Sequence, residues 1–123
     1  MTPSGRKNAD GTVTLRLTQN GKAKALTYNL DGMKIPVMKQ WDKKWRIILF
    51  DIPGKHKKAR DALARVLKNI GCRQFQKSVF INPFECQKEI DFVIEFFSLR
   101  SYVHTILADH LDNEFHLKTI FGL

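Results

Sequence analysis

The sequence predicts an α+β fold, in which two amphipathic helices pack on one face of a small antiparallel sheet. Three observations support this prediction. Residues 45–50 form a nearly continuous apolar run, which is typical of a strand buried on both faces. The clearest helical pattern in the chain follows at residues 59–70. Residues 73–83 are strand-like without an intervening helix, which disfavours the alternative of a doubly wound parallel sheet.

The chain begins with a short appendage. Residues 12–17 alternate polar and apolar side chains, which indicates a half-buried strand. Thr18 is placed to cap a short helix that would extend to about residue 30. We therefore divide the sequence into an appendage and linker at residues 1–40 and a main domain at residues 41–123.

The first helix of the main domain has one apolar face. Its apolar residues recur at i, i+3, i+4 and i+7 between Ala59 and Ile70, and Gly71 is the expected stop. After it, residues 73–83 predict either two short strands or one bent strand, ended by Pro83.

A second helix is expected from Glu85 to about Ser98. Phe92 and Phe96 extend its apolar surface to a second face, which would be covered either by a partner protein or by the chain's own C-terminus. Residues 102–108 predict a further strand, and Asp112 is placed to cap a last short helix. The main domain thus has the order β-α-β-β-α-β of a ferredoxin-like sandwich.

Charge gives the first indication of function. The 123 residues include 21 Lys and Arg against 12 Asp and Glu, a net charge of +9. Residues 1–60 carry +10 and residues 61–123 carry −1. A one-sided excess of this size favours a polyanionic partner such as DNA or RNA.

Two features of the sequence predict a cytoplasmic protein. The apolar runs are too short to cross a bilayer, and the first residues lack the apolar segment of a signal peptide.

Only two cysteines are present, Cys72 and Cys86, so we expect no disulfide scaffold. The four histidines and two distant cysteines show no zinc-ligand spacing.

Asp51 is the most informative single residue. It follows the buried strand directly and precedes a Pro-Gly turn. A carboxylate there is a candidate ligand for Mg²⁺ or Mn²⁺, which prefer oxygen ligands. No second acidic residue lies nearby in the sequence, so a two-fold dimer would have to supply the partner's Asp51. The alternative is an Asp that only ends the strand or caps the next segment.

Basic residues lie on both sides of this strand and at the start of the first helix. Helix N-termini attract phosphate, and cations placed there disfavour the helix slightly, which suggests a compensating use in phosphate contact. The alternative is a solvated basic surface. The candidate nucleic-acid-binding residues are Lys43, Lys44, Arg46, Lys55, Lys57, Lys58 and Arg60.

Several motifs together resemble the Cas-two family of CRISPR-associated proteins. These motifs are WRIILFDIP at residues 45–53, Arg60, Gly71 and QKSVF at residues 76–80. The resemblance is closer still to the Cas-two-like core of phenylacetate-repressor-type transcription regulators, which tend to have Trp-Asp-x-x-Trp-Arg before the strand. Here residues 41–46 match that pattern, and the resemblance covers about residues 41–121.

The resemblance implies a ferredoxin-like homodimer. In the CRISPR family, the residue that corresponds to Asp51 is the proposed metal ligand, and the two copies face each other across the dimer. Members are described as metal-dependent nucleases and as structural partners of the CRISPR integrase. In the regulator family, the same core mainly dimerises, and a winged helix-turn-helix ahead of it binds DNA.

The chain departs from the CRISPR family in two respects. Residues 1–40 precede the first strand and are similar to the last strand and exit helix of a winged-helix domain, without the rest of that domain. The chain is then a fragment, a shortened gene product or a stand-alone relative. In addition, Ile81 stands where an acidic residue often follows the Ser-Val-Phe motif, which weakens the case for nuclease activity.

Three hypotheses follow from the sequence. The first is a homodimeric nucleic-acid-binding protein in which Asp51 binds Mg²⁺ or Mn²⁺ and supports phosphodiester hydrolysis, as an endonuclease or a CRISPR adaptation factor. The second is the non-catalytic dimerisation core of a transcription regulator. The third is a structural adaptor that binds a partner protein through Phe92 and Phe96.

Overall fold

A computed structural model describes residues 5–10, 12–19, 22–28, 32–36, 38 and 40–123. Its strands are β1 (Gly5–Lys7), β2 (Val13–Gln19), β3 (Lys22–Tyr28), β4 (Trp45–Phe50), β5 (Arg73–Gln76), β6 (Val79–Asn82) and β7 (Val103–Ala108). Its helices are η1 (Gly54–His56, a 3-10 helix), α1 (Lys57–Asn69), α2 (Gln87–Phe96) and α3 (Glu114–Phe121). In the described part of the chain, no helix is long and apolar enough to span a membrane.

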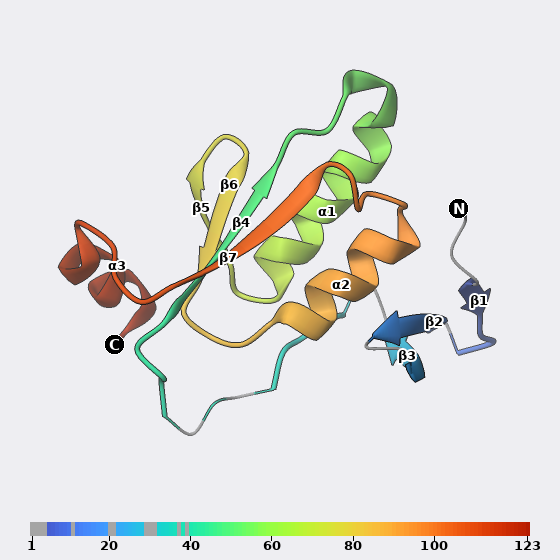
Figure 1. Cartoon of the computed structure of the whole chain (residues 1–123), viewed down its shortest axis with the longest axis horizontal. Helices are drawn as coiled ribbons and strands as arrows, with labels where there is room; N and C mark the ends of the chain where they lie inside the picture. Colours follow the sequence, from blue (N-terminus) through green and yellow to red (C-terminus); the bar gives the residue numbers. More distant parts are fainter. Residues whose placement is uncertain (1–4, 11, 20–21, 29–31, 37, 39) are drawn as a thin grey trace.

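The main sheet has four strands in the order β5-β6-β4-β7, and every neighbouring pair is antiparallel. Helices α1 and α2 cover one face of this sheet (Figure 1), which we call the inner face. The α+β prediction is confirmed, and the antiparallel pairing excludes the doubly wound alternative. The chain order β4-α1-β5-β6-α2-β7 is consistent with a ferredoxin-like sandwich. The segment 73–83 forms two short strands rather than one bent strand.

The inner face carries the main core. Ile48 and Phe50 of β4 pack in one cluster with Leu63 and Leu67 of α1. Helix α1 ends as predicted, because Gly71 adopts a left-handed conformation with φ of 96°. Its N–H donates to Lys68 O, and the N–H of Cys72 donates to Leu67 O, as in a Schellman motif.

The N-terminal appendage is a three-stranded antiparallel sheet, so the predicted strand at residues 12–17 is confirmed as part of β2, whereas the predicted helix after it is wrong. Residue Thr18, predicted as a helix cap, lies within β2 and is paired with Ala23 of β3. Cross-strand pairing supplies the backbone hydrogen bonds that an isolated short helix would have to make alone. The sequence Asn20-Gly21 is a common hairpin signal, and it favours the pairing of β2 with β3 over a helix capped by Thr18. Residues 20–21 and 29–30 of the predicted helix lie outside the described residues.

The second apolar face of α2 is covered by the N-terminal part of the chain. Phe92 is fully buried, in the same cluster as Val13 and Met33, and Phe96 packs against that cluster. Helix α2 also contacts β2. Both predicted covers, a partner protein and the chain's own C-terminus, are therefore wrong, and the adaptor hypothesis loses its proposed contact surface.

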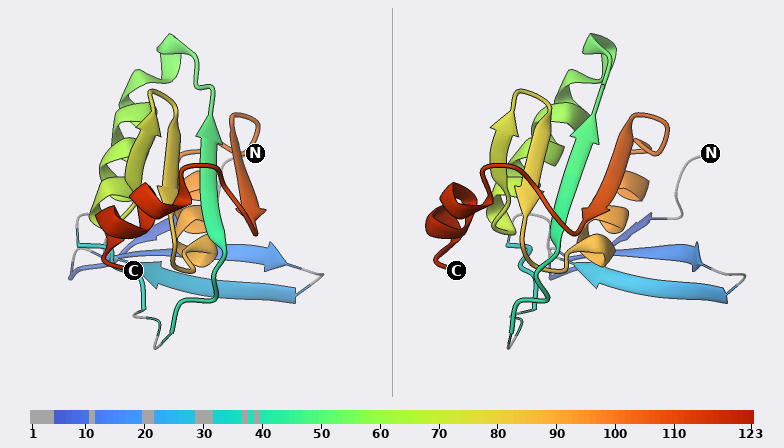
Figure 2. Two further views of the ribbon diagram at one scale, coloured as in Figure 1. Left: turned by 90° about the vertical axis from the view of Figure 1, so that its left-hand side faces the viewer. Right: turned by 60° about the vertical axis from the view of Figure 1, so that its left-hand side comes forward.

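Helix α3 lies on the opposite, outer face of the sheet (Figure 2). Its Leu117 forms a second small core with Trp45 and Ile81. The residue before the helix is Asn113, in a left-handed conformation, so the predicted cap at Asp112 is wrong. Helix α3 covers only the end of the sheet where β4 begins, because its core partners on β4 are Trp45 and Ile47.

Candidate functional site

Asp51 lies directly after β4, on an exposed rim of the sheet. Its backbone N–H donates a 2.9 Å hydrogen bond to the carbonyl oxygen of Tyr102, which fixes the strand end next to β7. Its carboxylate is exposed and lines a hollow of about 430 Å³ together with Ser78, Ser101 and His104. The predicted position of Asp51, at the end of a buried strand beside a turn, is thus confirmed.

The surroundings of Asp51 offer few metal ligands. In the part of the chain that the structure describes, no group of three or more His, Cys, Asp and Glu residues could hold a metal ion. Among the residues that the structure describes, Asp51 is the only carboxylate that lines its hollow. Mg²⁺ is usually bound through one or two carboxylates together with water and substrate phosphates, so Asp51 alone would be the minimum protein contribution to such a site. The role of Asp51 as a Mg²⁺ or Mn²⁺ ligand stays a prediction.

The predicted basic residues fall into two groups at opposite ends of β4. Lys43 and Lys44 precede the strand, whereas Lys55, Lys57, Lys58 and Arg60 follow it. A six-residue strand is about 20 Å long, so the two groups do not form one patch. The lysines of both groups are exposed to solvent.

Arg46 belongs to neither group, because it is buried. It sits on the inner face of β4 opposite Asn82 of β6, and only 8% of it is exposed. Its guanidinium donates to both carboxylate oxygens of Asp42, at 2.8 and 2.6 Å, and to the carbonyl oxygen of Pro83 at 2.8 Å. The hydrogen bond from Arg46 lowers the pKa of Asp42, and the same contact raises the pKa of Arg46. This network holds the entry of β4 and turns Arg46 away from solvent.

The outer face of the sheet is the feature that sequence reasoning missed. Phe75 and Ile106 lie on this face and remain 47% and 46% exposed. Ile47 and Leu49 of β4 lie between them and are only half-buried. The sequence predicts that β4 is buried on both faces, but the structure shows that its two faces are not buried equally. The alternation of burial along residues 45–50 could not be found in the sequence, because every position except Arg46 is apolar.

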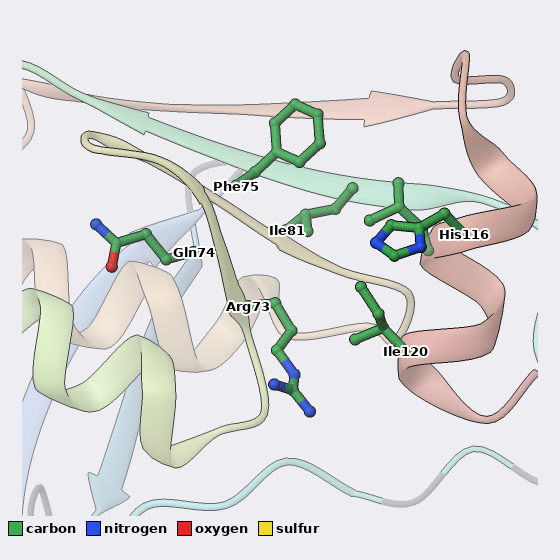
Figure 3. A pocket seen from close by; sticks show the side chains of 7 residues that line it. Arg73, Gln74, Phe75, Ile81, His116 and Ile120 are labelled. Carbon is green, nitrogen blue, oxygen red and sulfur yellow. The ribbon is translucent and has the colours of Figure 1, made fainter.

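A hollow separates α3 from the β5–β6 hairpin on this outer face. It measures about 430 Å³ and is lined by Phe75, Ile81 and Ile120, with Arg73 and His116 at its rim. Figure 3 shows Ile81 of the hairpin lying opposite His116 and Ile120 of α3. On the surface of α3 next to it, Phe115 is 84% exposed.

The two cysteines play no part in this face. Cys72 and Cys86 are both free and buried. Hydrogen bonding between the two thiols lowers the pKa of Cys72 and raises that of Cys86.

Residues 38–119 match a protein family described as the PaaX protein central Cas2-like domain. No curated protein and no solved structure shows significant similarity to the chain.

Proposed function

Since the chain belongs to the family of the PaaX protein central Cas2-like domain, we propose that it is the non-catalytic dimerisation core of a PaaX-type transcription regulator. The family match supports the regulator, and the exposed apolar outer face of the sheet supports dimerisation. In this proposal a second copy of the chain covers that face, and DNA is the nucleic acid on which the regulator acts in the cytoplasm.

The main support for the proposed dimer is the amino-acid composition of the outer face. An antiparallel sheet with one solvated face normally places polar residues on that face. Here the outer positions include Ile47 and Leu49 of β4, Val79 of β6 and Ile106 of the edge strand β7, with His104 of β7 as a polar exception. Contiguous exposed apolar surface of this kind marks contact sites in soluble proteins. A two-fold axis would place the same patch on both subunits, as an isologous interface requires.

Hydrolysis is not part of the proposal. Asp51 is the one carboxylate in its hollow within the described part of the chain, and a dimer through the outer face would add at most the partner's Asp51. The family match supports a PaaX-type regulator and gives no support for a nuclease. The Cas2-like resemblance therefore supports the shared fold and the dimer rather than an endonuclease or a contact with a CRISPR integrase.

The oligomeric state of the full chain tests the proposal. Sedimentation velocity should show a dimer, and Ile106→Lys should raise the dimer dissociation constant by about a hundredfold. Leu107→Lys is the matched control, because Leu107 is 58% exposed on the same strand but points to the other face. A monomeric wild type, or an Ile106→Lys protein that stays dimeric, would refute the proposal.

A further inference from the structure

We propose that the hollow between α1 and the β5–β6 hairpin is a binding site for phosphate groups, carried by a small phosphate compound or by a nucleic-acid backbone. This hollow lies on the α1 side of the hairpin, apart from the outer face that would take a second copy. The proposal therefore does not depend on dimerisation.

Three cationic side chains from two elements line this hollow. Its volume is about 310 Å³, at the small end of ligand sites in proteins. Arg60 and Lys68 come from α1 and Lys77 comes from the hairpin turn. Eight helical residues separate the backbone positions of Arg60 and Lys68 by about 12 Å, so their long side chains reach the hollow from its two ends. The tertiary fold is required to bring Lys77 to the same hollow.

The acidic residues do not balance this charge. Of the described residues, Asp61 is the one carboxylate that lines the hollow, and it is shared between Lys57 Nζ at 3.4 Å and Arg60 Nε at 4.0 Å. Within the described ranges of the chain, no carboxylate forms an ion pair with Lys68 or Lys77. The hollow therefore keeps two uncompensated cations, and like charges held together favour an anion between them.

Neutral donors and the floor of the hollow fit the same ligand. Ser78 and Gln74 add a hydroxyl and an amide to the lining. The amide of Gln74 also donates to the carbonyl oxygen of Lys77 at 3.1 Å, which holds the hairpin turn in place. Below them the floor consists of Phe50 and Phe80, stacked with ring centroids 5.9 Å apart and both buried. An apolar floor strengthens charge-assisted hydrogen bonds to a phosphate above it.

Pyrophosphate and a short DNA duplex are the probes that test this site. We would measure binding of each to the full chain by calorimetry, and follow the backbone amides of Gln74 and Ser78 by NMR. The double variant Lys68→Gln/Lys77→Gln should bind about a hundredfold more weakly, because each lost cation removes about a factor of ten. Lys88→Gln is the matched control, since Lys88 is an exposed lysine on α2 that lies outside the hollow.

The two probes distinguish the sources of the phosphate. Loss of pyrophosphate binding in the double variant, with shifts at Gln74 and Ser78 in the wild type, supports a site for a small phosphate compound. If the double variant loses binding only to the duplex, and the salt dependence of its duplex affinity corresponds to about two fewer phosphate contacts, the ligand is a nucleic-acid backbone. If the double variant binds both probes as the wild type and Lys88→Gln do, the proposal is wrong. Circular dichroism would verify that the variants, altered only at exposed lysines, are folded.

Discussion

The indole Nε1 of Trp45 donates a 3.0 Å hydrogen bond to Oε1 of Glu114, which joins the first strand of the main sheet to the first turn of α3. Trp45 is fully buried, and its ring contacts Trp41 edge-on with centroids 5.0 Å apart. The ammonium of Lys118 lies 5.6 Å from the Trp41 ring centroid. These contacts hold α3 on one end of the outer face and leave the rest of that face open.

Loss of the Trp45 hydrogen bond should loosen α3. Glu114→Ala leaves the buried indole N–H without its acceptor, which costs about 1 to 3 kcal/mol of unfolding free energy. Urea denaturation followed by tryptophan fluorescence measures the change. Asp112→Ala is the control, because Asp112 is exposed and does not cap the helix. Equal stability of Glu114→Ala and the control would show that the hydrogen bond contributes nothing.

Asp42→Asn should destabilise the entry of β4. The variant weakens the paired hydrogen bonds to Arg46, whose buried guanidinium keeps the carbonyl oxygens of Lys44 and Pro83 as partners. We expect a loss of about 1 to 2 kcal/mol at neutral pH. Chemical denaturation at pH 7 measures it, with Asp109→Asn, an exposed carboxylate outside this network, as the control.

The same pair predicts how stability changes with pH. Because Arg46 lowers the pKa of Asp42 below its ordinary 3.8, the contribution of Asp42 is complete above that value and disappears as pH falls through the folded-state pKa. The difference in stability between wild type and Asp42→Asn should therefore shrink as the solution is acidified below pH 3.8. A difference that stays constant through this range would contradict the assignment.

Phe92 should behave as a core residue. Phe92→Ala removes a fully buried ring from the cluster between α2 and the N-terminal segment, and should cost about 3 to 5 kcal/mol. Phe115→Ala is the matched control, because its ring is 84% exposed and its loss should change monomer stability by less than about 0.5 kcal/mol. Thermal unfolding of both variants under dilute conditions measures the contrast. Similar small effects would restore Phe92 as a surface residue available to a partner.

Asp51→Ala should leave phosphodiester hydrolysis unchanged. If the chain is a dimerisation core, purified wild type and variant should show the same background rate on single- and double-stranded RNA and DNA with Mg²⁺ or Mn²⁺. A wild-type rate well above that of Asp51→Ala would contradict the non-catalytic proposal and support the metal-dependent nuclease hypothesis. Because Asp51 is exposed, the variant should keep its thermal stability, which serves as the control for folding.

The parts of the fold that the sequence predicts are those with a strong local pattern. The apolar face of α1 and the glycine after it determine that helix almost without tertiary information. The residues of β3 show a case in which the local sequence pattern does not determine the secondary structure. Lys22 to Tyr28 could extend a capped helix or pair with β2, and only the partner strand decides between the two.

The candidate surfaces were harder to predict than the elements. Charge alone groups Arg46 with its exposed lysine neighbours, although the inward position on β4 buries it. The hollow beside α1 combines Lys68 and Lys77, which lie on two elements and belong to no charged run in the sequence. Such groupings depend on strand order and register, which no local pattern contains.

The separation of the lysines by the length of β4 sets a minimum size for any polyanion that contacts both groups. About 20 Å of strand corresponds to about six base pairs of duplex DNA at 3.4 Å per step. Duplexes shorter than this can contact the lysines at only one end of β4, whereas longer duplexes can contact both groups. Affinity plotted against duplex length should therefore rise in a step near half a helical turn.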